Sequence, residues 1–269
     1  MNTPAFLGEA RHFALELGLQ VAERLRQARA QTLQVLEKAQ GDWCSALDRE
    51  VEDWLRQRIA ERYPRHLFWG EESHSGTPTA AQLQGRHVWV VDPIDGSMNF
   101  LRGYPQYAVS IALLDGTVPV VACIVDPVRQ EAFSAARGQS AACNGQPLRV
   151  APTRQLAQCV AATVFPKPRA QFMDDYLLEL SAVMKNVSGV RRAGSMALEL
   201  AYLAAGRIDV FWARGMGAWD AAAGLLLIEE AGGQLWPLDG QPWYASGALA
   251  ASTPALRTDW QALLTQARA

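Results

Sequence analysis

Residues 89–100, WVVDPIDGSMNF, constrain the fold of this chain more than any other stretch. A run of apolar, β-prone residues leads directly into Asp92 and Asp95, with Pro93 and Gly96 placed around the two acids. The pattern predicts a buried strand whose carboxyl end carries two carboxylates. Asp-Pro-x-Asp-Gly is also good turn chemistry, because proline fixes φ and glycine tolerates a positive φ. A plain turn does not explain why two like charges follow a core strand, where each makes the other harder to ionise.

Two carboxylates at a strand end need protons or cations as partners. In α/β folds ligands bind beyond the carboxyl ends of the strands, and Mg²⁺ favours a few carboxylates together with phosphate oxygens. Gly96 and Ser97 are predicted to open a helix, whose free N–H groups suit an anion such as phosphate. Ser97 taken alone is equally a helix cap. The segment therefore predicts metal ligands and an anion cradle close together.

Further acids lie where they could complete such a site. LFWGEES (67–73) repeats the pattern of an apolar strand followed by acids, the first of which is Glu71. Asp220 opens an alanine-rich segment, and Asp48 lies early in a predicted helix. Each has an ordinary alternative: a solvated loop or helix cap for Glu71, a helix-dipole partner for Asp220 and a surface position for Asp48.

Apolar periodicity predicts an α/β protein of stacked helix and sheet layers. The middle strands, separated by turn signals such as Asn144-Gly145, predict a mixed or antiparallel sheet. Residues 1–269 are expected to form one unit with two lobes, about 1–147 and 148–269, neither of them independent. The expected helices are at about 4–30, 45–62, 169–185, 195–205, 219–231 and from 252 onward, and the expected strands at 67–69, 87–91, 107–114, 119–126, 130–136, 160–165, 208–212 and 247–251.

Composition excludes several classes of function. The chain is 49% hydrophobic with a formal net charge of -2, so it is globular and has no basic field to attract nucleic acid. Its four cysteines show no metal-ligand spacing and suit a reducing compartment. No apolar run approaches the ~20 residues that span a bilayer, and the N-terminus lacks a signal-peptide pattern. We expect a cytoplasmic protein without a membrane or nucleic-acid partner.

Together these segments resemble the inositol monophosphatase family, within the wider group of Mg²⁺-dependent, lithium-sensitive sugar-phosphate phosphatases. Residues 89–100 are similar to the family's W-x-[VI]-D-P-[IL]-D-G-T-x-N-F, and residues 219–233 to its W-D-x-A-[AG]-x-x-[IL]-[VIL]-x-E-A-G-G. GEES at 70–73 and the Gly194-Ser195 pair follow in the family's order, so the resemblance covers nearly the whole chain. It implies a layered αβαβα sandwich of the inositol monophosphatase and fructose-1,6-bisphosphatase type. It also implies a homodimer, for which the apolar middle strands could supply an interface.

The resemblance implies a metal-ligand set. Glu71 and Asp92 would share a first metal with the backbone carbonyl of Ile94. Asp92 would bridge to a second metal, completed by Asp95 and Asp220. The expected cofactor is Mg²⁺, with two or three ions per site. Two ions cancel the four carboxylate charges, and a dianionic phosphate then leaves the site negative, which a third ion or a basic side chain would offset. Lys38 is a candidate for that positive charge, with an ordinary solvated lysine as the alternative.

The resemblance also assigns the phosphate and water positions. Gly96 and Ser97 would hold the phosphate through backbone N–H groups, and Ser97 would add its hydroxyl. Asp48 and Ser97 would form the pair that, with Glu71, positions and deprotonates the attacking water. Ser97 replaces the family's usual threonine but keeps the hydroxyl. Met98-Asn99 replaces the Lys-Glu typical of members that act on 3′-phosphoadenosine 5′-phosphate and disfavours that substrate.

The expected substrate contacts are the part of the resemblance in which this chain departs most. Ala213 falls where inositol-specific members carry a glutamate that grips ring hydroxyls, and alanine accepts no hydrogen bond. Arg214 could recruit another polar or anionic group, and an exposed arginine without a partner is the alternative. The full set of expected substrate contacts is Asp95, Gly194, Ser195, Ala213 and Asp220.

The expected function is a Mg²⁺-dependent phosphomonoesterase that acts on a small polyol or sugar phosphate, with inositol monophosphate as the first candidate. Phosphate monoesters hydrolyse very slowly without a catalyst, and two metals about 4 Å apart can activate water and stabilise the leaving oxygen. Fructose 1,6-bisphosphate, histidinol phosphate and nucleotide 3′-phosphates are alternative substrates. A regulatory binding protein on the same fold is the alternative from another functional class.

Overall fold

The computed structural model describes residues 2–28, 35–39, 42–73 and 76–268, with the backbone alone for 35–39 and 42–45. The helices are α1 Pro4–Ala28, α2 Ala46–Arg62, α3 Ala80–Leu83, α4 Ser97–Arg102, α5 Met173–Asn186, α6 Met196–Ala204, α7 Ala218–Glu230, α8 Trp243–Ser246 and α9 Arg257–Gln266. The strands are β1 Val35–Ala39, β2 Asp42–Ser45, β3 Leu67–Gly70, β4 His87–Asp95, β5 Ala108–Asp115, β6 Val118–Asp126, β7 Glu131–Ala136, β8 Ala141–Cys143, β9 Gln146–Pro147, β10 Val160–Thr163, β11 Gly189–Arg191, β12 Val210–Ala213, β13 Gln234–Pro237 and β14 Leu249–Ser252.

Two large sheets carry the architecture of the described residues. The first has the order β3-β4-β5-β6-β7-β8-β9, with β3 and β4 parallel and every later pair antiparallel, so the expected mixed sheet is confirmed. The second has the order β11-β10-β12-β14-β13 and is also mixed. A small hairpin of β1 and β2 lies between α1 and α2, where no strand was expected.

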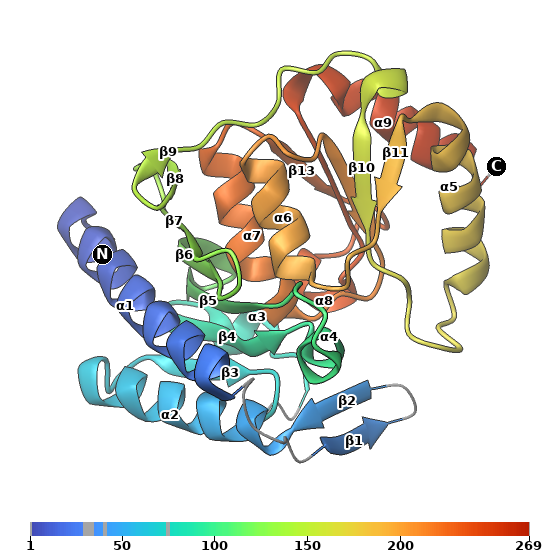
Figure 1. The fold of residues 1–269 in the computed structure, drawn as a ribbon. Coiled ribbons are helices and arrows are strands. Elements are labelled where there is room, and N and C mark those ends of the chain that lie inside the picture. Colours follow the sequence, from blue (N-terminus) through green and yellow to red (C-terminus); the bar gives the residue numbers. More distant parts are fainter. Residues whose placement is uncertain (1, 29–34, 40–41, 74–75, 269) are drawn as a thin grey trace.

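The helices and sheets stack in five alternating layers (Figure 1). Helices α1 and α2 cover one face of the first sheet, α6 and α7 fill the space between the two sheets, and α5 and α9 cover the outer face of the second. Three apolar cores separate these layers, one on each side of the first sheet and one beneath α5 and α9. The αβαβα sandwich expected from the resemblance is therefore confirmed. The division into lobes near residue 147 stays a prediction.

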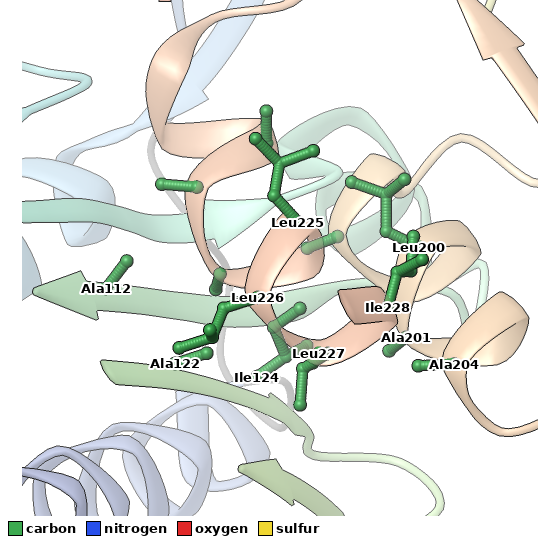
Figure 2. Packing of buried hydrophobic residues seen from close by; sticks show 14 of the residues in the cluster. Ala112, Ala122, Ile124, Leu200, Ala201, Ala204, Leu225, Leu226, Leu227 and Ile228 are labelled. Atoms are coloured by element: carbon green, nitrogen blue, oxygen red, sulfur yellow. The ribbon is translucent and has the colours of Figure 1, made fainter. Parts of the chain in front are cut away.

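Small side chains allow the central layer to be thin. The alanine-rich helix α7 lies across β5 and β6, with Leu226 and its neighbours packed over Ala112 and Ala122 (Figure 2). A Cβ at Gly224 would lie 2.4 Å from Cβ of Leu200 on α6, so only glycine permits this helix–helix approach. The central layer consequently brings the beginning of α7, which follows Gly217, against the end of β4.

The middle strands form part of the hydrophobic core of a single chain. Residues of β5, β6 and β7 are buried on both faces, by α1 on one side and by α6 and α7 on the other. The faces of these strands are therefore covered within one chain, and the homodimer stays a prediction. Within the described residues, no helix is long and apolar enough to cross a membrane.

Two element boundaries differ from the sequence-based expectation. The helix expected from about residue 169 begins at Met173, because Pro166 and Pro168 precede it and Arg169 has a φ of 65°. The last helix, expected from 252, begins at Arg257 after a 3₁₀ turn, Pro254–Leu256, in which Pro254 takes the first position. The other expected elements are present with ends shifted by a few residues.

Candidate active site

The two acids of the 89–100 segment converge because β4 is irregular at its end. Positions three apart point to opposite faces of a regular strand. The pairing of β4 with β5 shifts register between Asp92, opposite Ser110, and Asp95, opposite Ala108. This bulge re-aims the second acid. Pro93, which has no N–H for the ladder, lies within it.

Asp220 joins these two acids from a distant part of the sequence. One carboxylate oxygen from each of Asp92, Asp95 and Asp220 lies within 4.8 Å of the others. Asp220 is in the first turn of α7, where its Oδ2 accepts a hydrogen bond of 2.7 Å from the backbone N–H of Gly217. Mg²⁺ binds oxygens at about 2.1 Å, so carboxylates at this spacing can share ions. The helix-dipole reading of Asp220 does not account for its place beside two other acids.

Hydrogen bonds from the chain fix the direction of each carboxylate. The backbone N–H of Ile94 donates to Asp92 Oδ1 over 2.9 Å. Asp95 accepts the hydroxyl of Ser195 and the backbone N–H groups of Met196 and Ala197, the last two at 3.1 and 2.8 Å. Asp95 is thus held by the first turn of α6, which leaves little freedom for its oxygens.

The acids are costly to ionise without a cation. Burial raises the pKa of Asp92 and of Asp220 well above the usual carboxyl range, and neighbouring acids, Glu71 among them, raise both further. Burial also raises the pKa of Asp95 to about 6, although its three hydrogen-bond donors oppose the rise. Carboxylates arranged in this way bind either protons or metal ions.

Ser97 and Asp48 form the hydroxyl–carboxylate pair that the resemblance implies. Ser97 Oγ lies 2.8 Å from Asp48 Oδ1 and 2.8 Å from the carbonyl oxygen of Ile94. Asp48 is 1% exposed. The alternative interpretation, in which Asp48 lies on the surface, is therefore wrong. The start of α2 lies against the end of β4 and buries this side chain.

The turn after Asp95 requires glycine. Gly96 has a φ of 88°, and a Cβ there would lie 3.0 Å from the carbonyl oxygens of Gln106 and Gly194. Asn99 holds the same segments together, because its Nδ2 donates to the carbonyls of Gln106 and Ala193 at 2.7 and 2.8 Å. Sequence reasoning missed this role of Asn99, although the residue lies inside the 89–100 segment.

A cavity of about 500 Å³ opens above the acids. Most of the expected site residues line it. Ser195 and Asp48 lie behind the lining: the Ser195 hydroxyl donates to Asp95, and Asp48 accepts from Ser97. Met98, which the sequence analysis used only as evidence against one substrate, also lines the cavity. Sequence reasoning had given no site role to the other lining residues, which are Lys167, Arg192, Gly215, Met216, Gly217 and Trp219. The expected residues in the lining are Glu71, Asp92, Ile94, Asp95, Gly96, Ser97, Gly194 and Asp220.

Size alone does not identify the site. A second cavity, of about 490 Å³, lies between the β5–β6 turn and the β13–α8 region. Its lining is largely apolar, with Trp236 and Trp243 among the residues, and its only charged lining residues in the described part are Arg137 and Glu229. These two pair with each other at 2.8 Å. The chemistry of the acids, and not the volume, marks the first cavity as the candidate active site.

Ala213 and Arg214 do not lie where a substrate contact would need them. Ala213 is 1% exposed, pairs with Leu249 in the second sheet and does not line the cavity. Arg214 is also buried, and its guanidinium contacts both carboxylate oxygens of Glu179 at 3.1 and 2.7 Å. The idea of an exposed or substrate-recruiting Arg214 is therefore wrong. Lys38 lies in β1, whose side chains are outside the described part.

Comparisons with known proteins give the chain its family. The sequence model of the inositol monophosphatase family matches residues 7–269. The chain is 43% identical over 211 residues to an inositol-1-monophosphatase of Rhizobium meliloti, which covers 78% of this chain and 77% of that one. It is 41% identical over 207 residues, 76% of each chain, to the Nus factor SuhB of Pseudomonas aeruginosa.

Solved structures agree with the sequence comparisons. The extragenic suppressor protein suhB from Bartonella henselae superposes with a TM-score of 0.84 and 34% sequence identity, covering 93% of this chain and 96% of that one. A match over nearly the full length, in sequence and in fold, leaves little of the chain outside it. This protein belongs to the inositol monophosphatase family.

Proposed function

We propose that this protein is a Mg²⁺-dependent phosphomonoesterase that hydrolyses a small polyol or sugar phosphate, with inositol monophosphate as the first substrate to test. The convergence of Asp92, Asp95 and Asp220 at the floor of one cavity carries the proposal. Three carboxylates this close together, two of them buried, destabilise the fold unless protons or cations bind them.

The donor set fits magnesium. The candidate ligands are all oxygens, as a hard divalent cation requires, and no histidine or cysteine lines the cavity among the described residues. Glu71, Asp92 and the carbonyl of Ile94 would hold one ion, and Asp92, Asp95 and Asp220 a second. When bound, Mg²⁺ lowers the pKa of water and stabilises negative charge on the leaving oxygen. The number of ions, two or three, belongs to the proposal.

The chain's own groups would then position the reactants. Gly96 and Ser97 line the cavity, and their backbone N–H groups would hold phosphate oxygens. The Ser97 hydroxyl donates to Asp48, so its oxygen is free to accept a proton from the attacking water while Asp48 takes the hydroxyl proton. Glu71 would orient the same water. Much of the acceleration would come from this positioning and from charge stabilisation.

A phosphate-release assay tests the proposal. Purified protein is incubated with inositol 1-phosphate, fructose 1,6-bisphosphate, histidinol phosphate and adenosine 3′-phosphate, each with Mg²⁺ and with EDTA. We expect Mg²⁺-dependent release from at least one of them and none from an Asp92→Asn variant. The proposal is wrong if no substrate releases phosphate with Mg²⁺, or if EDTA leaves the rate unchanged.

A second role is supported by the name of one relative, the Nus factor SuhB of Pseudomonas aeruginosa. We propose that a contact with transcription machinery, if this chain makes one, is independent of the acids. Affinity capture of RNA polymerase from lysate by wild-type protein and by Asp92→Asn tests this idea. Equal capture by both supports it, loss of capture by Asp92→Asn alone rejects it, and absence of polymerase from both rejects the contact itself. The homodimer also stays a prediction, which light scattering of the purified protein would test.

A further inference from the structure

A buried glutamate that the proposed catalysis does not use lies one helical turn beyond Asp48. Glu52 is on α2, four residues after Asp48, so the two side chains lie on the same face of the helix. Helix α2 packs against β4 (Figure 1). Glu52 is 1% exposed, and charged side chains are almost never buried to this degree unless they have partners. The partners of its carboxylate therefore indicate what this residue does.

Each oxygen of the Glu52 carboxylate accepts a hydrogen bond. Oε2 accepts from the backbone N–H of Glu72 over 2.7 Å. Oε1 accepts from Nη2 of Arg56, one turn further along α2, over 3.0 Å. The Arg56 side chain is 42% exposed, so this ion pair reaches the solvent. The other bond joins α2 to the backbone segment that follows β3.

The segment that follows β3 carries Glu71, a proposed ligand of the first ion. The backbone N–H of Glu71 donates to the carbonyl oxygen of Val91 on β4 over 3.1 Å. The next backbone N–H, that of Glu72, donates to Glu52. The sheet therefore holds the backbone before the Glu71 side chain, and α2 holds the backbone after it. Of these two bonds, only the second depends on a side chain, so a substitution can remove it.

Gly70 allows the Glu52 carboxylate to approach this segment closely. A Cβ on Gly70 would overlap the carboxylate group, with Oε1 only 2.7 Å away. The carboxylate cannot move aside easily, because it is buried and both of its oxygens are bonded. Gly70 is not among the glycines with a positive φ, so its backbone would accept alanine. Alanine at this position thus offers a second way to displace the Glu52 carboxylate.

We propose that Glu52 is a positioning residue for the metal site, because its bond to the Glu72 N–H fixes the backbone from which Glu71 reaches the first ion. This inference rests on the proposed function, in which Glu71 is a ligand of Mg²⁺. Loss of a hydrogen bond that orients a metal ligand typically costs about 10–100-fold in metal affinity or activity. Removal of the Glu52 carboxylate should therefore weaken Mg²⁺ binding without changing any contact with the substrate.

Two measurements on the whole chain test the proposal. The first is the rise in melting temperature when Mg²⁺ is added to metal-free protein, which reports binding without turnover. The second is the Mg²⁺ dependence of phosphate release from the best substrate of the panel. In both, Glu52→Ala should raise the Mg²⁺ concentration for half-maximal effect by about tenfold or more. The substrate KM at saturating Mg²⁺ should stay nearly unchanged, and high Mg²⁺ should restore most of kcat.

Two further variants test the contact itself. Glu52→Gln keeps one acceptor oxygen for the Glu72 N–H and places its amide NH₂ toward the half-exposed Arg56, so it should retain a Mg²⁺ requirement close to that of wild type. Gly70→Ala should raise the requirement as Glu52→Ala does. The double variant should show no further rise, because the carboxylate that alanine would displace is already absent.

Asp126 supplies the matched control. Its carboxylate is fully buried and accepts the backbone N–H groups of Val128 and Arg129 at 2.8 and 2.9 Å. It also pairs with the guanidinium of Arg129, whose side chain is 42% exposed, as that of Arg56 is. Asp126 does not line the cavity. Asp126→Ala should lower the melting temperature of the metal-free protein, as Glu52→Ala does, and leave the Mg²⁺ requirement unchanged.

The outcomes distinguish the inference from the function beneath it. An unchanged Mg²⁺ requirement in Glu52→Ala would overturn the inference while the phosphatase stands, and Gly70→Ala decides the question if Glu52→Ala does not fold. An equal rise in Asp126→Ala would also overturn it, since lost stability would then explain the effect. If wild-type protein binds Mg²⁺ but releases no phosphate from any substrate, the proposed function is wrong, and the melting temperatures still test Glu52. If Mg²⁺ stabilises no form of the protein, both are wrong.

Discussion

The floor and the rim of the candidate active site are built in opposite ways. The floor acids come from a strand end, where Asp92 and Asp95 are buried, and from a helix start, where Asp220 is half-buried. Neighbouring N–H and O–H groups fix their oxygens. The rim offers the long, exposed side chains of Lys167 and Arg192 on connecting segments. Metal–ligand distances must be correct to within a few tenths of an ångström. Attraction between charges acts over longer distances and needs less exact placement. The comparison separates the fixed acids, which are expected to control turnover, from the exposed side chains above them.

The largest expected effect comes from the floor. Asp92→Asn should reduce kcat by at least about 10³-fold, because Asp92 is a proposed ligand of both ions. The same change removes a buried negative charge from among Glu71, Asp95 and Asp220. The metal-free variant should therefore have a higher melting temperature than metal-free wild-type protein. Calorimetry in EDTA checks this point, and a lower melting temperature would show that the acids do not repel one another.

A smaller loss is expected one step from the acids. Ser97→Ala removes the hydroxyl that joins Asp48 to the carbonyl of Ile94 and should lower kcat roughly 10²-fold. Ser97→Thr keeps the hydroxyl and should retain most of the activity. Steady-state kinetics on the best substrate from the panel measures both variants. Equal activity of the alanine and threonine variants would remove Ser97 from the proposed proton path.

Substitutions behind the part of the cavity lining formed by residues 215–217 should reduce stability more than turnover. Glu179 is fully buried and pairs with Arg214 directly before this wall, and with Arg268 at 3.2 Å. Glu179→Gln leaves buried positive charge unpaired and should cost about 3–5 kcal/mol of unfolding free energy. The KM should rise only severalfold.

An exposed ion pair supplies the control for that prediction. Arg137 and Glu229 lie 2.8 Å apart on the surface, and Arg137→Gln should cost under about 1 kcal/mol. Urea denaturation of both variants measures the difference. Similar losses in the two would mean that burial does not set the worth of the Glu179 pair.

The smallest expected effect is a pH dependence confined to the floor. The pKa of Asp95 is raised from 3.8 to about 6 in the folded protein, so the folded state binds protons more readily than the unfolded chain. This contribution to stability is complete below about pH 4 and is lost as the pH rises past 6. In EDTA, wild-type protein should lose melting temperature over this range relative to Asp95→Asn. Saturating Mg²⁺ should abolish the difference in slope, and a persisting slope would contradict the metal assignment.

Local patterns predicted much of the site. Asp92, Asp95, Gly96 and Ser97 lie in one short segment, in which apolar residues, proline and glycine constrain the backbone directly. The long helix α1 was equally predictable, because Leu7, Leu17 and the other buried residues recur along one face. Contacts between remote segments were not predictable in this way. Asn99 bridges two loops, and Arg214 pairs with a glutamate on α5. The partners in these contacts are far apart in the sequence, so no local pattern predicts them.

The sequence by itself determined that a buried strand ends in two acids, that a glycine turn follows, and that acids recur at two other element boundaries. These features depend on steric and hydrophobic preferences of neighbouring residues, which act over a few positions of the chain. Only the tertiary structure decided that Asp220 and Asp48 meet this strand end, and that Lys167 and Arg192 form the rim above it. Those placements follow from how α2, α6 and α7 pack on the sheets, since packing alone sets the distance between residues far apart in sequence.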